Sequence, residues 1–145
     1  MAGMCIVAAV DDSKHAARVA AEGATLAAAF DCELHLINVL TRSQFVEIEH
    51  TSYERRGETV SIDRVRKYAK QIADRAGADL NRSATAVGLV GDITDETLEY
   101  AAEHDARYLV IGGRRRSKVG KAFFESVTQD ILLRADRPVV TVMRD

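Results

Sequence analysis

This 145-residue sequence has no tryptophan, one proline, two cysteines and four histidines. Cys5 and Cys32 form no Cys-x-x-Cys pair, and the histidines do not have the spacing of zinc ligands. These absences argue against a zinc site and against thiol redox chemistry. We therefore expect both thiols to act as small hydrophobic side chains inside the protein.

A long hydrophobic run is also missing. No apolar stretch approaches the roughly 18 to 20 residues that span a bilayer. The segment from Met1 to Cys5 contains no basic residues of the kind that open a secretory signal. We therefore expect a cytoplasmic protein that has no membrane partner.

Neither sign of charge dominates the sequence. Twenty Lys and Arg residues against twenty-two Asp and Glu residues give a formal net charge of −2, which argues against nucleic acid as a partner. The apolar share of 47% is ordinary for a globular chain. The length predicts that residues 1–145 form a single domain.

Short apolar runs alternate with segments of helical period. The runs predict five strands, at Met4 to Val10, Glu33 to Leu40, about Ala84 to Val90, Tyr108 to Ile111 and Val139 to Met143. The periodic segments predict four helices, at Lys14 to Phe30, Ser61 to about Ala76, Thr94 or Asp92 to His104 and about Glu125 to Arg134. This alternation predicts an α/β fold with one open, doubly wound, five-stranded parallel sheet.

Details of the helices follow from the same patterns. Asp12 or Ser13 is expected to cap the first helix. In the second helix, Ile62 and Tyr68 are expected to face inward, and Ala102 likewise in the third. The polar stretch from Thr41 to about Thr59 fits no element, and a loop of this length is typical of a lid, a partner surface or disorder.

Ligands of an open parallel sheet bind beyond the carboxyl ends of its strands. Asp11 follows the first strand directly, where a carboxylate would meet a ribose, a metal or a cation. The stretch IGGRRRSKVGKAFFESVT, from Ile111 to Thr128, is a candidate phosphate cradle, because Gly112 and Gly113 allow close backbone approach and a helix follows. A solvated basic loop before an ordinary capped helix is the structural alternative.

The common catalytic and nucleotide motifs are absent from the sequence. It contains no G-x-G-x-x-G, no G-x-S-x-G and no H-E-x-x-H, and Ala122 follows Gly120-Lys121 where a P-loop needs Ser or Thr. We therefore expect no enzyme activity beyond, at most, marginal ATP hydrolysis.

Several segments in a fixed order carry a family resemblance. They are Ile6 to Ser13, Leu34 to Leu40, Val90-Gly91-Asp92, Tyr108 to Gly112, Ser126-Val127-Thr128 and Arg137 to Val140. In this order and spacing the chain resembles the universal stress protein family over essentially its full length. The resemblance implies an adenine nucleotide alpha hydrolase-like fold, and a homodimer paired through the last strand.

The resemblance also implies a set of residues that bind ATP. Asp11 would contact the adenine or ribose, and the backbone of Val39 or Leu40 would meet the base. Ribose and phosphates would meet a second group, which is Gly112, Gly113, Ser126, Val127 and Thr128.

Two positions depart from the G-x2-G-x9-G-[S/T] motif of the family members that bind ATP. Arg115 stands at the second glycine and Glu125 at the third. The Arg115 side chain adds a cation but can block close approach, and the Glu125 carboxylate repels a phosphate.

These departures leave more than one function open. The chain could be a stress-response module that binds ATP or another adenine nucleotide, or a dimeric protein-interaction module of the same fold that acts through unknown regulatory partners. A more remote alternative is a phosphoacceptor receiver, suggested by the adjacent acids Asp11 and Asp12 after the first strand. The receiver lysine expected after the fifth strand is missing from Val142 to Asp145.

Overall fold

A computed structural model of the chain describes residues 4–57, 61–114 and 125–144. Its single sheet has the strand order β3-β2-β1-β4-β5, and every pair of neighbouring strands is parallel. This arrangement confirms the open five-stranded sheet expected from the sequence. The strands are β1 (Cys5–Ala9), β2 (Glu33–Leu40), β3 (Thr85–Val90), β4 (Ala106–Arg114) and β5 (Val139–Arg144).

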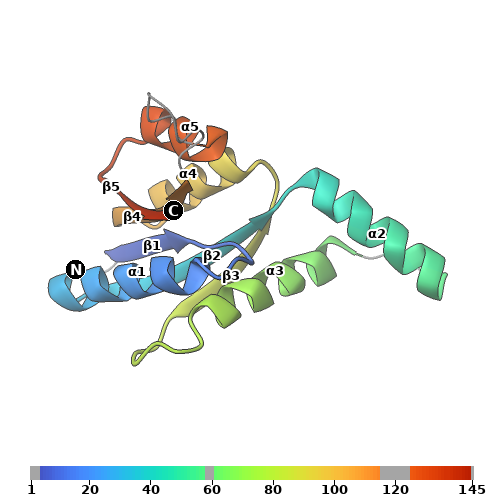
Figure 1. Cartoon of the computed structure of the whole chain (residues 1–145), viewed down its shortest axis with the longest axis horizontal. Coiled ribbons are helices and arrows are strands. Elements are labelled where there is room, and N and C mark those ends of the chain that lie inside the picture. Colours follow the sequence, from blue (N-terminus) through green and yellow to red (C-terminus); the bar gives the residue numbers. More distant parts are fainter. Residues whose placement is uncertain (1–3, 58–60, 115–124, 145) are drawn as a thin grey trace.

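Helices cover both faces of the sheet. α1 (Ala16–Phe30) and α3 (Ile62–Ala76) pack on one face, and α4 (Ile93–Glu103) and α5 (Ser126–Arg134) on the other (Figure 1). Leu34, Leu36, Ile37 and Leu109 are among the fully buried side chains between these layers. None of the described helices is long and apolar enough to cross a bilayer.

A fifth helix corrects the expectation for the stretch from Thr41 to Thr59. Most of that stretch is α2 (Arg42–Arg56), which extends away from the sheet (Figure 1). Thr41 starts the helix with a capping box, in which Thr41 Oγ1 accepts from Gln44 N and Gln44 Oε1 accepts from Thr41 N. Gly57 ends it in a left-handed conformation with φ of 68°. Local capping therefore makes a helix where no apolar stripe predicts one.

Two further expectations about element ends are wrong. α1 begins after His15, which makes no side-chain cap, and neither Asp12 nor Ser13 caps it. β4 is longer than the expected Tyr108 to Ile111 because β5 pairs with its end, where Gly112, Gly113 and Arg114 lie beside Val142, Met143 and Arg144. Pairing with a neighbouring strand thus holds two glycines in a strand despite their low strand propensity.

The inward faces of the helices also differ in part from those expected. Ile62 and Tyr68 are 45% and 44% exposed, and Ala102 is exposed as well. α3 turns a different stripe inward, and its backbone lies directly on Gly88 of β3. That stripe is Val65, Ala69, Ile72, Ala73 and Ala76. Both cysteines are free thiols, Cys5 fully buried and Cys32 partly buried.

We expect Gly88→Ala to lower the free energy of unfolding by about 3 kcal/mol, the cost of overpacking a core. A Cβ at Gly88 would overlap the Arg66 carbonyl oxygen and the Lys70 amide nitrogen, so the helix backbone would have to move. Urea unfolding measures this loss. Gly57→Ala is the control, since a Cβ there meets nothing within 4 Å and adds only a left-handed strain of about 1 kcal/mol. An equal loss in both variants would contradict the close approach of α3.

Candidate functional site

A pocket of about 210 Å³ lies at the carboxyl ends of β1, β2 and β4. We call it the strand-end pocket. It is far larger than the roughly 10–15 Å³ that one water needs. Val10, Val39, Ile93 and Ile111 supply apolar wall, so a flat apolar group can lie against these side chains. The pocket stands where an open parallel sheet ordinarily binds its ligand.

Two buried polar atoms, each on a residue that lines this pocket, have no hydrogen-bond partner among the described residues. They are Asn38 Oδ1 and Thr97 Oγ1, on side chains of residues that are 5% and 0% exposed. Asn38 Nδ2 donates to the Val10 carbonyl at 2.8 Å, which fixes the amide so that Oδ1 is a free acceptor. Leaving a buried polar group unpaired costs about 1–3 kcal/mol. A ligand that donates a hydrogen bond here would recover that cost.

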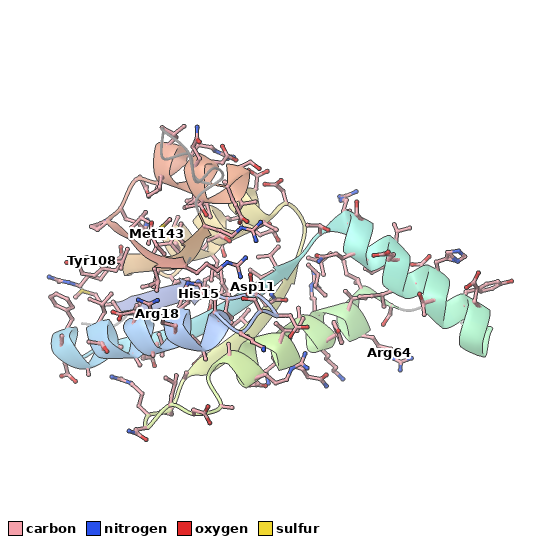
Figure 2. All side chains as sticks on the ribbon, viewed as in Figure 1. Asp11, His15, Arg18, Arg64, Tyr108 and Met143 are labelled. Atoms are coloured by element: carbon pink, nitrogen blue, oxygen red, sulfur yellow. The ribbon has the colours of Figure 1, made fainter. Side chains whose placement is uncertain are left out.

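Asp11 and His15 lie close together where β1 leads into α1, as Figure 2 shows. Asp11 Oδ1 accepts from Ser13 N at 3.0 Å and from the Ser13 hydroxyl, and this turn leaves the Asp11 side chain exposed. His15 Nε2 donates to the Val142 carbonyl at 2.7 Å, which ties the start of α1 to β5. The carboxylate is therefore positioned by its own turn and remains accessible to a ligand.

Gly112 and Gly113 line the pocket, but packing within the protein already explains their small size. A Cβ on Gly112 would lie 3.3 Å from atoms of His15 and Val19. A Cβ on Gly113 would lie 2.6 Å from Thr141 Cγ2. The space above these glycines is thus filled by side chains of α1 and β5.

The start of α5 forms another part of the pocket wall, through Glu125, Val127 and Thr128. Thr128 Oγ1 donates to the Gly112 carbonyl at 3.1 Å and joins the helix to β4. Glu125, the residue before α5, pairs with Arg114 at 2.9 Å between Oε1 and Nε. A carboxylate therefore stands at the helix end where an incoming phosphate would be favoured.

The structure brings together most of the residues expected to bind a ligand. Asp11, Val39, Gly112, Gly113, Val127 and Thr128 all line the strand-end pocket. Leu40 and Ser126 do not: the Leu40 side chain packs against α3, and its carbonyl accepts from Gly91 N at 2.9 Å. Arg115 lies outside the described residues.

Sequence reasoning missed three polar residues of the pocket, namely His15, Asn38 and Arg144. Thr97 also lines the pocket, and sequence reasoning assigned it no role in binding. Asn38 carried a usable signal, because an amide within the apolar run from Leu34 to Leu40 has to find partners at a sheet edge or in a ligand.

A second polar cluster lies at the amino ends of the strands, and its groups are partnered. The Tyr100 hydroxyl bonds His35 Nδ1 at 2.8 Å, and His35 Nε2 lies 3.4 Å from Glu33. The Tyr100 ring stacks on His104, and burial raises the pKa of Tyr100 to about 12. Because its hydrogen bonds are satisfied within the protein, this cluster stabilises the fold. No group of three or more potential metal ligands gathers within residues 4–57, 61–114 and 125–144.

Comparison with known proteins agrees with the fold. The Universal stress protein family matches residues 4–143. A curated universal stress protein of Mycolicibacterium smegmatis (strain ATCC 700084 / mc(2)155) is 45% identical over 51 residues, which cover 35% of this chain and 39% of that relative.

Solved structures extend the likeness over nearly the whole chain. A universal stress protein from Archaeoglobus fulgidus is 27% identical, with a TM-score of 0.63 and coverage of 96% of this chain and 98% of that one. A universal stress protein from Archaeoglobus fulgidus in complex with dAMP is 24% identical, with a TM-score of 0.58 and coverage of 98% and 99%.

The two buried threonines of the pocket should respond in opposite directions to the same substitution. We expect Thr97→Val to raise the free energy of unfolding of the ligand-free protein by about 1 kcal/mol, because it removes an unpaired buried hydroxyl. Thr128→Val should lower it by about 1 kcal/mol, because it removes the hydrogen bond to Gly112. Urea unfolding of both variants measures the two changes. Destabilisation by Thr97→Val would mean that its hydroxyl already has a partner.

Proposed function

Because the chain belongs to the universal stress protein family, we propose that it is a regulatory stress-response module that binds an adenine nucleotide or nucleoside in the strand-end pocket. ATP is one member of this ligand class. The proposal assigns the protein a binding role, with ATP turnover at most marginal. A steady-state turnover near the typical enzyme value of about 10 per second would contradict that role.

The observation that carries the proposal is the pair of unpartnered atoms, Asn38 Oδ1 and Thr97 Oγ1, in an otherwise largely apolar wall. Pockets for small molecules combine apolar walls with a few placed polar groups. Asn38 Oδ1 accepts only, so it fits a ligand that presents an N–H or O–H group. The amino group of adenine and the hydroxyls of ribose are donors of this kind.

The residues present fit the nucleoside part of such a ligand better than its phosphates. Apolar Val10, Val39 and Ile93 can lie against a purine, and the exposed carboxylate of Asp11 can accept from ribose hydroxyls. The related Archaeoglobus fulgidus protein in complex with dAMP supports this ligand class for the fold. Glu125, by contrast, puts a negative charge where a phosphate would approach.

We expect an adenine ligand to stabilise the protein by mass action. At 100 times its Kd, adenosine, AMP or ATP would add about 2.7 kcal/mol to the free energy of unfolding and raise Tm by several degrees. Thermal unfolding at millimolar ligand, followed by calorimetric titration, measures both effects. No rise in Tm with any of these three ligands would contradict the proposed function.

A matched pair of variants locates the ligand within the protein. Thr97→Val should weaken binding by about three- to tenfold, the value of one net hydrogen bond of about 0.5–1.5 kcal/mol. Thr25→Val is the control, because Thr25 is exposed on α1 and its hydroxyl bonds Ala21 within the helix. Equal affinities in the two variants would place the ligand away from Thr97.

One observation favours a second candidate, a protein-interaction module without a nucleotide. α2 extends away from the sheet (Figure 1) and exposes two large side chains, Val46 at 62% and Tyr53 at 61%. Phe45 and Ile48, in its first half, pack against the body of the protein. If no adenine ligand binds, α2 is the surface on which to look for partners.

We also expect a homodimer through β5. In the described sheet β5 lies at an edge and pairs only with β4, so its other side is open to a further strand. A second β5 strand can pair with this side around a two-fold axis. Light scattering at micromolar concentration should give the mass of two chains, and the mass of one chain would refute this expectation.

A further inference from the structure

We propose that the Arg18 side chain covers the end of the open edge of β5 and thereby sets the register in which two β5 strands pair. The inference rests on the homodimer expected above, and not on the ligand of the strand-end pocket. It goes beyond that homodimer because it names the residues that lie opposite each other. The partner is a second copy of this chain, paired antiparallel over residues 139–141.

The direction of the β5 backbone groups follows from its pairing with β4. The Leu109 amide donates to the Pro138 carbonyl at 3.0 Å, so the carbonyl of Pro138 faces β4. Backbone groups of alternate strand residues point to the same neighbouring strand, so the next even-numbered residues of β5 face β4 as well. The residues of β5 that turn their backbone groups to the open side of the sheet are therefore Val139, Thr141 and Met143.

A guanidinium occupies the far end of this open side. Arg18 Nη1, on α1, donates to the Met143 carbonyl at 3.4 Å (Figure 2). About one turn earlier, His15 Nε2 donates to the neighbouring Val142 carbonyl at 2.7 Å. Two side chains at the start of α1 thus hold the last residues of β5, and Arg18 fills the position that a further strand would take beside Met143.

The near end of the open side is limited by the backbone itself. Residues 136–137 form a bend before β5 begins at Val139, and Pro138 has no N–H to donate. A partner strand can therefore pair from Val139 onward. The free part of the edge lies between this bend and Arg18, over Val139 to Thr141.

The register that uses the whole free part of the edge is symmetric. In an antiparallel pair around a two-fold axis, Val139 of each chain lies opposite Thr141 of the other, and each such pair exchanges both of its backbone hydrogen bonds. The two Val140 residues then face each other across the axis as a non-hydrogen-bonded pair, with Cα atoms about 4.5 Å apart. No bond in this register requires the Met143 carbonyl.

A longer register becomes accessible when Arg18 is removed. With the axis at Thr141, this residue lies opposite its own copy, and Met143 lies opposite Val139 of the second chain, so all three open residues pair. In the wild-type chain the Arg18 guanidinium stands where the Val139 amide of the second chain would donate to the Met143 carbonyl. The longer register is therefore blocked at both of its ends.

Disulfide cross-linking reads the register, because two cysteines form a bond only when their Cα atoms lie within about 7 Å. The background is Cys32→Ser, since Cys32 is partly buried, while the fully buried Cys5 stays. Under mild oxidation, Val140→Cys should cross-link the two chains, as non-reducing gel electrophoresis measures. Thr141→Cys should not, because an offset of two residues at about 3.4 Å each, added to the spacing between strands, exceeds that distance.

Arg18→Ala should shift this pattern toward the longer register. Thr141→Cys should then cross-link about three- to tenfold more, the gain expected from one further net hydrogen bond, and Val140→Cys should cross-link less. Arg64→Ala is the matched control, because Arg64 is an exposed arginine on α3, far from Met143 (Figure 2). It should leave the wild-type pattern unchanged.

The outcomes separate the register from the homodimer. Preferential cross-linking of Thr141→Cys with Arg18 present, or a pattern that Arg18→Ala leaves unchanged, would overturn the inference while the homodimer through β5 stands. The mass of one chain by light scattering would overturn both. The mass of two chains with no cross-link at either position would place the partner on another surface and would also overturn both.

Discussion

The strand-end pocket depends on the hydrogen bond from Asn38 Nδ2 to the carbonyl of Val10, where β1 ends. Together with the bond from Val10 N to the Ile37 carbonyl, it keeps the chain beside β2 until the turn at Asp11 leads into α1. The same bond fixes the Asn38 amide, whose oxygen is buried and has no partner among the described residues. One side chain thus both builds the wall and creates the unmet acceptor from which we infer a ligand.

Periodicity in the sequence was sufficient to predict the sheet, since a parallel sheet needs near-continuous apolar strands such as Leu34 to Leu40, and these are easily recognised. It was not sufficient for α2, whose stability starts from the capping box of Thr41 and Gln44 and not from an apolar stripe. The length of β4 was also missed, because the pairing of Gly112 and Gly113 with β5 is a long-range effect. The residues of the strand-end pocket also differ in how far the sequence could predict them. Residues at strand ends were predictable from topology, whereas the unpaired state of Asn38 and Thr97 needed coordinates.

Glycine and glutamate at the β4–α5 side of the strand-end pocket have different consequences. A Cβ on Gly113 would overlap Thr141, and a Cβ on Gly112 would press against His15 and Val19, so glycine at these positions does not by itself indicate a nucleotide. Glu125 carries more information, because its ion pair with Arg114 places a charge in the pocket wall.

The central claim is that the ligand contacts Asn38 and Thr97, and NMR of ¹⁵N-labelled protein titrated with adenosine tests it most directly. The account predicts that the side-chain amide of Asn38 and the backbone amides of Val39 and Thr97 shift with increasing ligand, while Cys5 and Glu33 at the amino ends of the strands do not. Saturating adenosine that leaves Asn38 and Thr97 unshifted, or that shifts only the amino ends of the strands, would contradict it.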